Sequence, residues 1–177
     1  MKKIILVLSL LVFLACTNET ESISYESQYI TSLADWDYYK SQNGNSYVYT
    51  VNFESWSGVG DVTTITVNNG AVTQRTYESY DLYDVDGNYL GWSNRIVLDS
   101  YIESDSEVGE NTSGAEAVNI DSLYIDCVSD VLSVDSSVNS ITFTTDEANI
   151  LQNCYYTPNG CMDDCSFGVF VTSITWF

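Results

Sequence analysis

Residues 47–77 read YVYTVNFESWSGVGDVTTITVNNGAVTQRTY, and this stretch decides the fold. In its first part, apolar residues alternate with more polar ones as far as Phe53. A period of two is typical of a strand with one buried face. Two glycines then interrupt the pattern, and later Asn69-Gly70 provides a dipeptide typical of hairpin turns. The stretch therefore predicts three consecutive antiparallel strands, at residues 47–54, 62–67 and 71–77.

Residues 27–41, before this stretch, have the period of an amphipathic helix. Ser27 is a candidate N-cap, and Asn43-Gly44 is a candidate stop signal. Four apolar residues recur at helical spacing and predict a stripe that faces the core: Tyr29, Ile30, Leu33 and Trp36.

A second helix is predicted after the three strands, at residues 119–133, with Asn119 as its N-cap. Its apolar face includes Cys127, which should therefore point into the core. Residues 94–102 fit either a strand or a short helix, and residues 103–116 have the composition of an exposed loop. Further strands are predicted at residues 141–144, 150–156 and 168–177.

These elements predict a single α+β domain at residues 25–177. We expect one antiparallel sheet of about six to eight strands, with two helices packed on one face. Aromatic, valine and threonine residues, which favour strands, are abundant: the chain has 14 Tyr, 6 Phe and 4 Trp.

The N-terminus has the layout of an export signal. Lys2 and Lys3 precede the apolar run Ile4–Leu14, which is shorter than the 20 or so residues that a membrane span needs. The sequence Phe13-Leu14-Ala15-Cys16 resembles the lipobox of bacterial lipoproteins. The resemblance implies a signal peptide at residues 1–15 and lipidation, palmitate included, at Cys16. Residues 16–24 would then be a flexible tether, and the protein would be anchored to the outer membrane, on its periplasmic face or at the cell surface.

Four cysteines remain after Cys16: Cys127, Cys154, Cys161 and Cys165. An even number of cysteines in an exported protein predicts two disulfides, and three pairings are possible. Their spacing matches neither the paired C-x₂-C pattern of zinc sites nor the C-x-x-C of redox-active dithiols.

Charge and composition exclude several functions. The chain has 25 acidic and 5 basic residues and no histidine. Such a negative field repels phosphate backbones, which argues against nucleic-acid binding, and it repels anionic lipids, which leaves membrane contact to the lipid anchor. Without histidine the usual base of Ser and Cys hydrolases is missing. We therefore expect a protein that is not an enzyme and has no cofactor.

Residues 84–88 (DVDGN) fit two interpretations. Asp-Gly and Gly-Asn are turn residues, and the flanking tyrosines suit a β-hairpin. Alternatively, Asp84, Asp86 and Asn88 present oxygens at alternate positions, as a calcium loop does. The EF-hand pattern requires Gly at its sixth position and an acidic residue at its twelfth, where this chain has Tyr89 and Arg95. The hairpin is the preferred interpretation, and no metal site is predicted.

Five short motifs are spread along the chain: the first helix with its Trp, the strand NSYVYTV (45–51), the turn VNNG (67–70), the helix IDSLY (120–124) and the loop Asp163-Asp164-Cys165. Together they resemble a group of uncharacterised Bacteroidetes-type bacterial lipoproteins, a family of unknown function. The resemblance implies an α+β fold and assigns no activity or catalytic residue.

The function expected from the sequence is that of a non-catalytic binding or interaction module of the cell envelope. Its tyrosines and acidic residues favour a cationic protein or a carbohydrate as partner. Two alternatives are a carboxylate-dependent enzyme such as a glycoside hydrolase, which needs no histidine, and a structural module stabilised by calcium.

Overall fold

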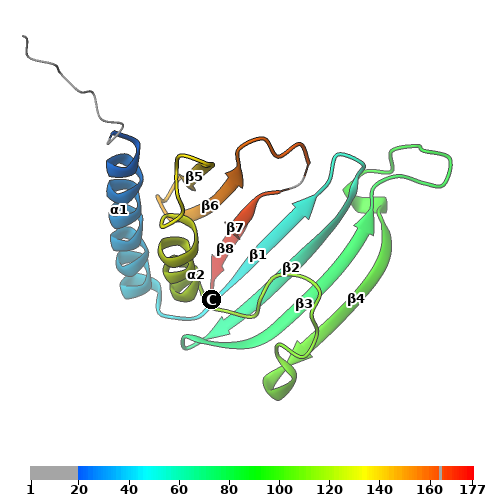
Figure 1. Ribbon diagram of the computed structural model, residues 1–177. Coiled ribbons are helices and arrows are strands. Elements are labelled where there is room, and N and C mark those ends of the chain that lie inside the picture. Colours follow the sequence, from blue (N-terminus) through cyan, green and yellow to red (C-terminus); the bar gives the residue numbers. More distant parts are fainter. Residues whose placement is uncertain (1–19, 164) are drawn as a thin grey trace, which may run out of the picture.

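The computed structural model describes residues 20–163 and 165–177, with side chains from Tyr25 onward, and it confirms the α+β class. The expected signal peptide at residues 1–15 and Cys16 lie outside the described residues. Among the described residues, no helix is long and apolar enough to cross a membrane. In chain order the elements are α1 (Thr20–Asn43), β1 (Tyr47–Glu54), β2 (Val59–Asn68), β3 (Ala71–Asp81), β4 (Ile96–Ser104), α2 (Ile120–Asp126), β5 (Asn139–Thr145), β6 (Leu151–Pro158), β7 (Phe167–Phe170) and β8 (Ser173–Trp176) (Figure 1).

The eight strands form two antiparallel sheets, where the sequence analysis expected one. The first has the order β4-β3-β2-β1-β8, and the second has the order β5-β6-β7. The division falls inside the single final strand predicted at residues 168–177. The Val171 N–H donates to Gln152 O of β6, in the second sheet, and the following N–H, of Thr172, donates to Thr50 O of β1, in the first. One continuous segment therefore joins the two sheets.

The three strands predicted from residues 47–77 are confirmed as β1, β2 and β3. In the β2–β3 turn, Asn69 has φ +50° and Gly70 has φ +84°. Positive φ at both central residues is what a type I′ hairpin turn requires, and Asn-Gly is the pair that adopts it most readily. Residues 94–102, which fitted either a strand or a helix, contribute to the strand β4.

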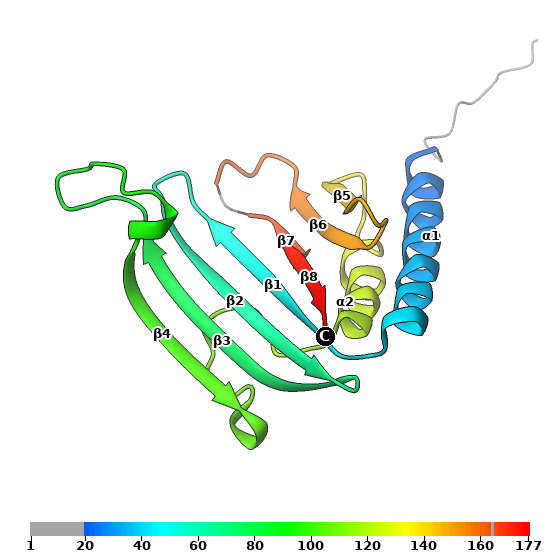
Figure 2. The same cartoon turned by 180° about the vertical axis from the view of Figure 1, so that it is seen from behind.

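The core lies between the first sheet, the helices and the second sheet. Figure 1 shows α1 and α2 beside each other on one side of the first sheet, and Figure 2 shows that neither of these helices covers its opposite face. The odd positions of β1 point toward the helices, so Tyr47 and Tyr49 are buried. Fully buried Trp36 of α1 packs edge-on against Tyr47 and stacks on Trp176 of β8.

Helix α1 ends at Asn43, two residues beyond the predicted end at residue 41, and Gly44 follows with φ +87°, so the Asn43-Gly44 stop signal is confirmed. Its start differs from the prediction, because the helix begins at Thr20 and includes the last part of the expected tether 16–24. The residues before Ser27 contain no Gly or Pro that would interrupt a helix, so Ser27 is not an N-cap. Ile30 is 58% exposed and does not belong to the core stripe.

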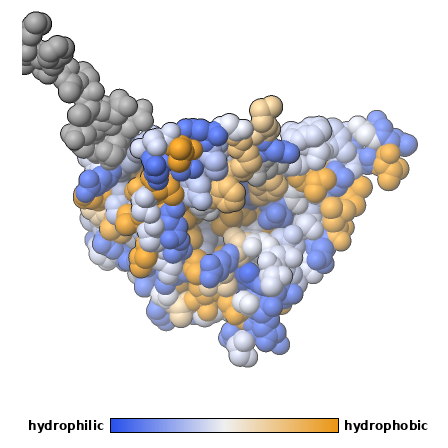
Figure 3. Space-filling view, in the orientation of Figure 1, coloured by the Kyte–Doolittle hydropathy of each residue, from blue (hydrophilic) through white to orange (hydrophobic). Residues whose placement is uncertain are grey.

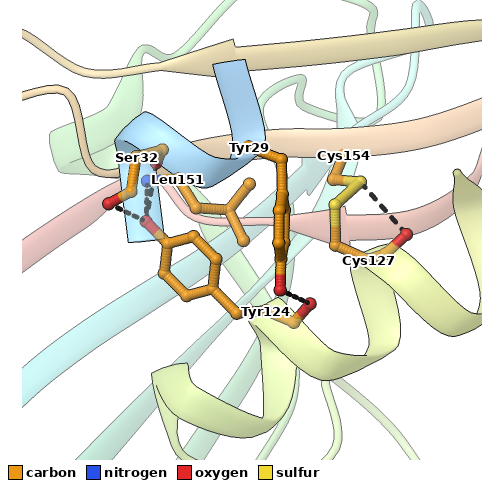
Figure 4. Close-up of a disulfide and its surroundings, with 6 residues drawn as sticks. All are labelled: Tyr29, Ser32, Tyr124, Cys127, Leu151 and Cys154. Carbon is orange, nitrogen blue, oxygen red and sulfur yellow. Dashed lines mark hydrogen bonds between the residues drawn. A yellow bond between two sulfur atoms is a disulfide. The ribbon is translucent and has the colours of Figure 1, made fainter. Parts of the chain in front are cut away.

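Helix α2 begins as predicted, with the Asn119 side chain accepting a hydrogen bond from the Ser122 N–H. After Asp126 the chain continues as one π-helical turn, Cys127–Val131. Figure 4 shows how α1, α2 and β6 meet around Tyr124. The Tyr124 hydroxyl lies 2.7 Å from Ser32 Oγ and accepts a 2.9 Å hydrogen bond from the Leu151 N–H, so the three elements share one buried polar group.

Strand β4 forms a free edge of the first sheet. Most of its side chains are exposed, and hydrophobic colour gathers at the side of the molecule where β4 and the loop before it lie (Figure 3). The exposed apolar residues of β4 are Ile96, Val97, Leu98 and Ile102.

Candidate functional site

The four remaining cysteines pair as two disulfides, which confirms the prediction and selects one of the three pairings. Cys127 of the π turn is bonded to Cys154 of β6, with both residues fully buried (Figure 4). Cys161 is bonded to Cys165 between β6 and β7. Cys127 points into the core, as the helical pattern predicted.

The turn at residues 84–88 has the predicted tight geometry. Tyr83 and Tyr89 form an isolated antiparallel bridge, and the Asp84 N–H donates to Asn88 O. Both carboxylate oxygens of Asp84 accept a hydrogen bond from the Asn88 side-chain amide, and one also accepts from the Asp86 and Asn88 N–H groups. These bonds lower the pKa of Asp84. The three residues of the calcium alternative are thus held by hydrogen bonds within the turn.

A segment between β4 and α2, residues 105–118, crosses the inner face of the first sheet (Figure 1); we call it the crossing segment. Hydrogen bonds from strand side chains hold it there. The Arg75 guanidinium donates to Asn111 O at 2.6 Å and to Ala115 O at 3.0 Å, and Thr63 Oγ1 accepts from the Ala115 N–H. Farther along, the Tyr49 hydroxyl donates to Val118 O at 2.7 Å.

A groove of about 620 Å³ lies between the crossing segment, the ends of β1 and β2, α2 with its π turn, and β7; we call it the acidic groove. Four carboxylates line it, from different elements: Asp61 of β2, Glu116 of the crossing segment, Asp126 of α2 and Asp130 of the π turn. Aromatic side chains form much of the remaining wall: Tyr49, Phe53, Tyr156, Phe167 and Phe170.

Two of these carboxylates have a raised pKa. Burial raises the pKa of Asp61, because removal from water disfavours the charged form. Burial also raises the pKa of Asp126, and the neighbouring charges of Asp130 and Glu116 add to this effect. A cation bound in the groove would lower both pKa values again. It would replace the hydration that these carboxylates lose on burial, and it would offset the repulsion between them. Shifted carboxylates that meet in a groove are typical of functional sites.

No positive charge of the described chain is available to neutralise the groove, because each basic side chain already has an acidic partner. Lys40 pairs with Asp37 and Asp121, Arg75 with Glu103, and Arg95 with Glu78. None of these three basic residues lines the acidic groove.

The carboxylates of the groove are spread along its walls. Within residues 20–163 and 165–177, no three His, Cys, Asp or Glu side chains come together closely enough to hold a metal ion. The groove therefore combines dispersed negative charge with aromatic faces, an arrangement that suits an extended or organic cation.

A second groove, of about 650 Å³, lies between α1, the π turn and β5. Tyr25, Ile30, Leu132 and Ile141 are among its residues, and Glu26 is its single charged one. We take the acidic groove as the candidate site because four carboxylates from different elements meet there beside aromatic rings, and two of these carboxylates have a raised pKa.

Sequence reasoning did not find this site, although one signal was present. Odd positions of β2 face the core, and Asp61 occupies such a position, opposite Phe53 of β1. An acidic residue at an inward-facing position of a strand is uncommon without a partner or a role. The predicted strand began at residue 62, which left Asp61 in a loop.

Comparisons with known proteins add no assignment. The chain matches no model of a protein family, no curated protein and no solved structure.

Proposed function

We propose that this protein is a lipid-anchored, non-catalytic binding module of the bacterial envelope, and that its acidic groove binds a cationic partner. The observation that carries the proposal is the groove itself, where four carboxylates and several aromatic rings meet without a basic residue. Carboxylates attract a Lys or Arg side chain by charge, and an aromatic face attracts the same group by the cation–π interaction.

Composition supports the same partner. The chain has a net charge of −20, which steers cations toward it over distances comparable with the Debye length of roughly 8 Å at physiological salt. The field of the whole protein sets the rate of encounter, and the groove supplies the place where the partner is held.

The anchor is the first part of the proposal to test. Replacing Cys16 with Ser should abolish incorporation of labelled palmitate and release the protein from the membrane fraction, because the thiol is the acceptor of the lipid. The measurement is metabolic labelling followed by cell fractionation, with the wild type as reference. Equal labelling and equal membrane association of Cys16→Ser would contradict lipidation at this residue.

Binding by the groove is tested with a pair of variants of equal charge. Asp126→Asn combined with Asp130→Asn should weaken the affinity for a lysine-rich peptide by about tenfold, since two groove charges are lost. The control, Asp86→Asn combined with Glu147→Gln, removes two acidic residues outside the groove and should change affinity little. Isothermal titration calorimetry measures both. Equal losses in the two variants would show that net charge acts without the groove.

The same titration has an expected pH dependence. The raised pKa values of Asp61 and Asp126 mean that these groups take up protons at higher pH than ordinary aspartates. Protonation removes the charge that the cation needs, so affinity should fall on acidification, and the fall should begin at a higher pH than for aspartates with an ordinary pKa. A fall that begins only where ordinary aspartates titrate would argue against Asp61 and Asp126 as contacts.

The glycoside hydrolase alternative is favoured by the same raised pKa values, because a glycosidase needs one protonated carboxyl as general acid. Aromatic walls also stack on sugar rings. An activity screen on chromogenic glycosides distinguishes the two functions: turnover that Asp61→Asn or Asp126→Asn abolishes would establish the enzyme and overturn the binding module.

A further inference from the structure

Strand β1 is paired along its whole length on one side, by β2. On the other side, β8 pairs with only half of its length. Strand β2 pairs with β1 from Tyr47 to Glu54, whereas β8 pairs only from Tyr47 to Thr50. In the part of the chain that the structure describes, no strand pairs with residues 51–54 on the β8 side.

The backbone groups at this open half point away from β2. On the β8 side, Ser46 O accepts from the Phe177 N–H and Thr50 O accepts from the Thr172 N–H. Backbone groups alternate in direction along a strand, so those of Asn52 and Glu54 face the same side as those of Ser46 and Thr50. They form a short open edge that can pair with another strand.

The acidic groove runs beside this open edge. Val51 and Phe53 of β1 form one side of the groove, and β7 forms another. Strand β7 is itself at the edge of the second sheet, because among the described strands it pairs with β6 alone. Between β1 and β7 the two sheets diverge, and the space between these edges belongs to the groove.

A strand added along β1 would place every second side chain on the inner face of the sheet. Phe53 of β1 and Asp61 of β2 lie opposite each other on that face, and Asp126 and Asp130 line the same groove. Alternate cationic side chains would therefore meet the carboxylates and the aromatic rings together. The remaining side chains would lie on the opposite face, beside Asn52 and Glu54, where polar residues suffice.

We propose that the partner is an extended peptide segment, with Lys or Arg at every second residue, that binds by adding a strand to the Val51–Glu54 half of β1. This inference rests on the proposed function, because it identifies the partner of the same groove. Main-chain hydrogen bonds to the open edge supply affinity, and the groove selects the alternating cations.

Two peptides of identical composition test the alternation. One alternates Lys and Thr, and the other has the lysines in one block followed by the threonines. The alternating peptide should bind at least about tenfold more tightly, because only it presents all its lysines on one side of a strand. Methylating the backbone nitrogens that face β1 should abolish this advantage while preserving every charge.

Two variants at one position test the edge. Asn52→Pro removes the N–H that faces the partner, whereas Asn52→Ala keeps this N–H; both lose the hydrogen bond that Asn52 Oδ1 accepts from the Tyr80 hydroxyl. Proline is tolerated at an edge where its nitrogen faces away from the paired strand. We expect Asn52→Pro to bind the alternating peptide about tenfold more weakly than Asn52→Ala, at similar melting temperatures.

Amide hydrogen exchange of the wild type distinguishes strand addition to β1 from binding of cations in the acidic groove alone. Strand addition should slow exchange at the amides of Asn52 and Glu54 when the alternating peptide binds. Binding without this protection, or equal affinity for the two peptides, would overturn strand addition and leave the cationic groove in place. Binding of neither peptide would overturn the groove as well.

Discussion

Replacing both Cys127 and Cys154 with alanine should lower the free energy of unfolding by about 3 to 4 kcal/mol and the melting temperature by about 10 °C. The two cysteines are 27 residues apart, and the chain-entropy model gives this magnitude for a loop of that length. Both residues are fully buried, so the lost sulfur contacts add to the effect.

The second disulfide provides the matched control. Cys161 and Cys165 are four residues apart, so their bond restricts the unfolded chain far less. Replacing this pair with alanine should lower the free energy of unfolding by about half as much or less. Thermal denaturation followed by circular dichroism measures both double variants. An equal loss in the two double variants would contradict the dependence of the stabilisation on loop length.

The same disulfide positions part of the candidate site. Asp126 precedes Cys127, and Asp130 lies in the turn that Cys127 begins. Helix α2 and its π turn are tied to β6 by this bond and by the hydroxyl of Tyr124. We therefore expect the variant without the disulfide to lose affinity for cationic peptides at temperatures where it is still folded.

The features that could be predicted from the sequence are those with a local cause. The strands at residues 47–77 follow from a period of two and from one Asn-Gly turn, and each of these signals lies within a few residues. The cap of α2 at Asn119 is equally local. The disulfides followed from counting cysteines, whereas their pairing depends on which strands lie beside α2.

The features that could not be predicted depend on residues far apart in the chain. Residues 168–177 have one strand pattern, and their division between two sheets depends on where Gln152 and Thr50 lie. The acidic groove combines carboxylates from residues 61, 116, 126 and 130, and only the last two are related by a helical spacing. These four are among 25 acidic residues of the chain, and apart from the inward-facing position of Asp61 nothing distinguishes them until the fold brings them together.

Arg75 and Glu103 form the ion pair on which the crossing segment depends. Both side chains are almost fully buried, and the guanidinium donates to the carboxylate at 2.8 and 3.0 Å. Glu103 also accepts hydrogen bonds from the Gly109 and Asn111 N–H groups, and these bonds together with Arg75 hold its pKa well below the usual range. The pair thus joins β3 and β4 to the segment that carries Glu116 into the groove.

Replacing Arg75 with Met should therefore lower the melting temperature by about 10 °C or more and weaken binding in the groove. Methionine fills similar space but leaves Glu103 buried without a counter-charge. The carbonyl oxygens of Asn111 and Ala115 also lose the hydrogen bonds that they accept from Arg75. The double variant Arg75→Met, Glu103→Gln should be more stable than the single one, because it removes the uncompensated charge.

The decrease in melting temperature that Arg75→Met causes should also depend on pH. A carboxyl with a depressed pKa contributes stability above its ordinary pKa, and this contribution is lost as the pH falls toward the depressed value. In the variant, Glu103 lacks its cation and protonates at higher pH than in the wild type. The difference in melting temperature between the two proteins should therefore be largest near neutrality and shrink in acid. A difference that stays constant with pH, together with simple additivity in the double variant, would show that Arg75 acts through packing and not through the charge of Glu103.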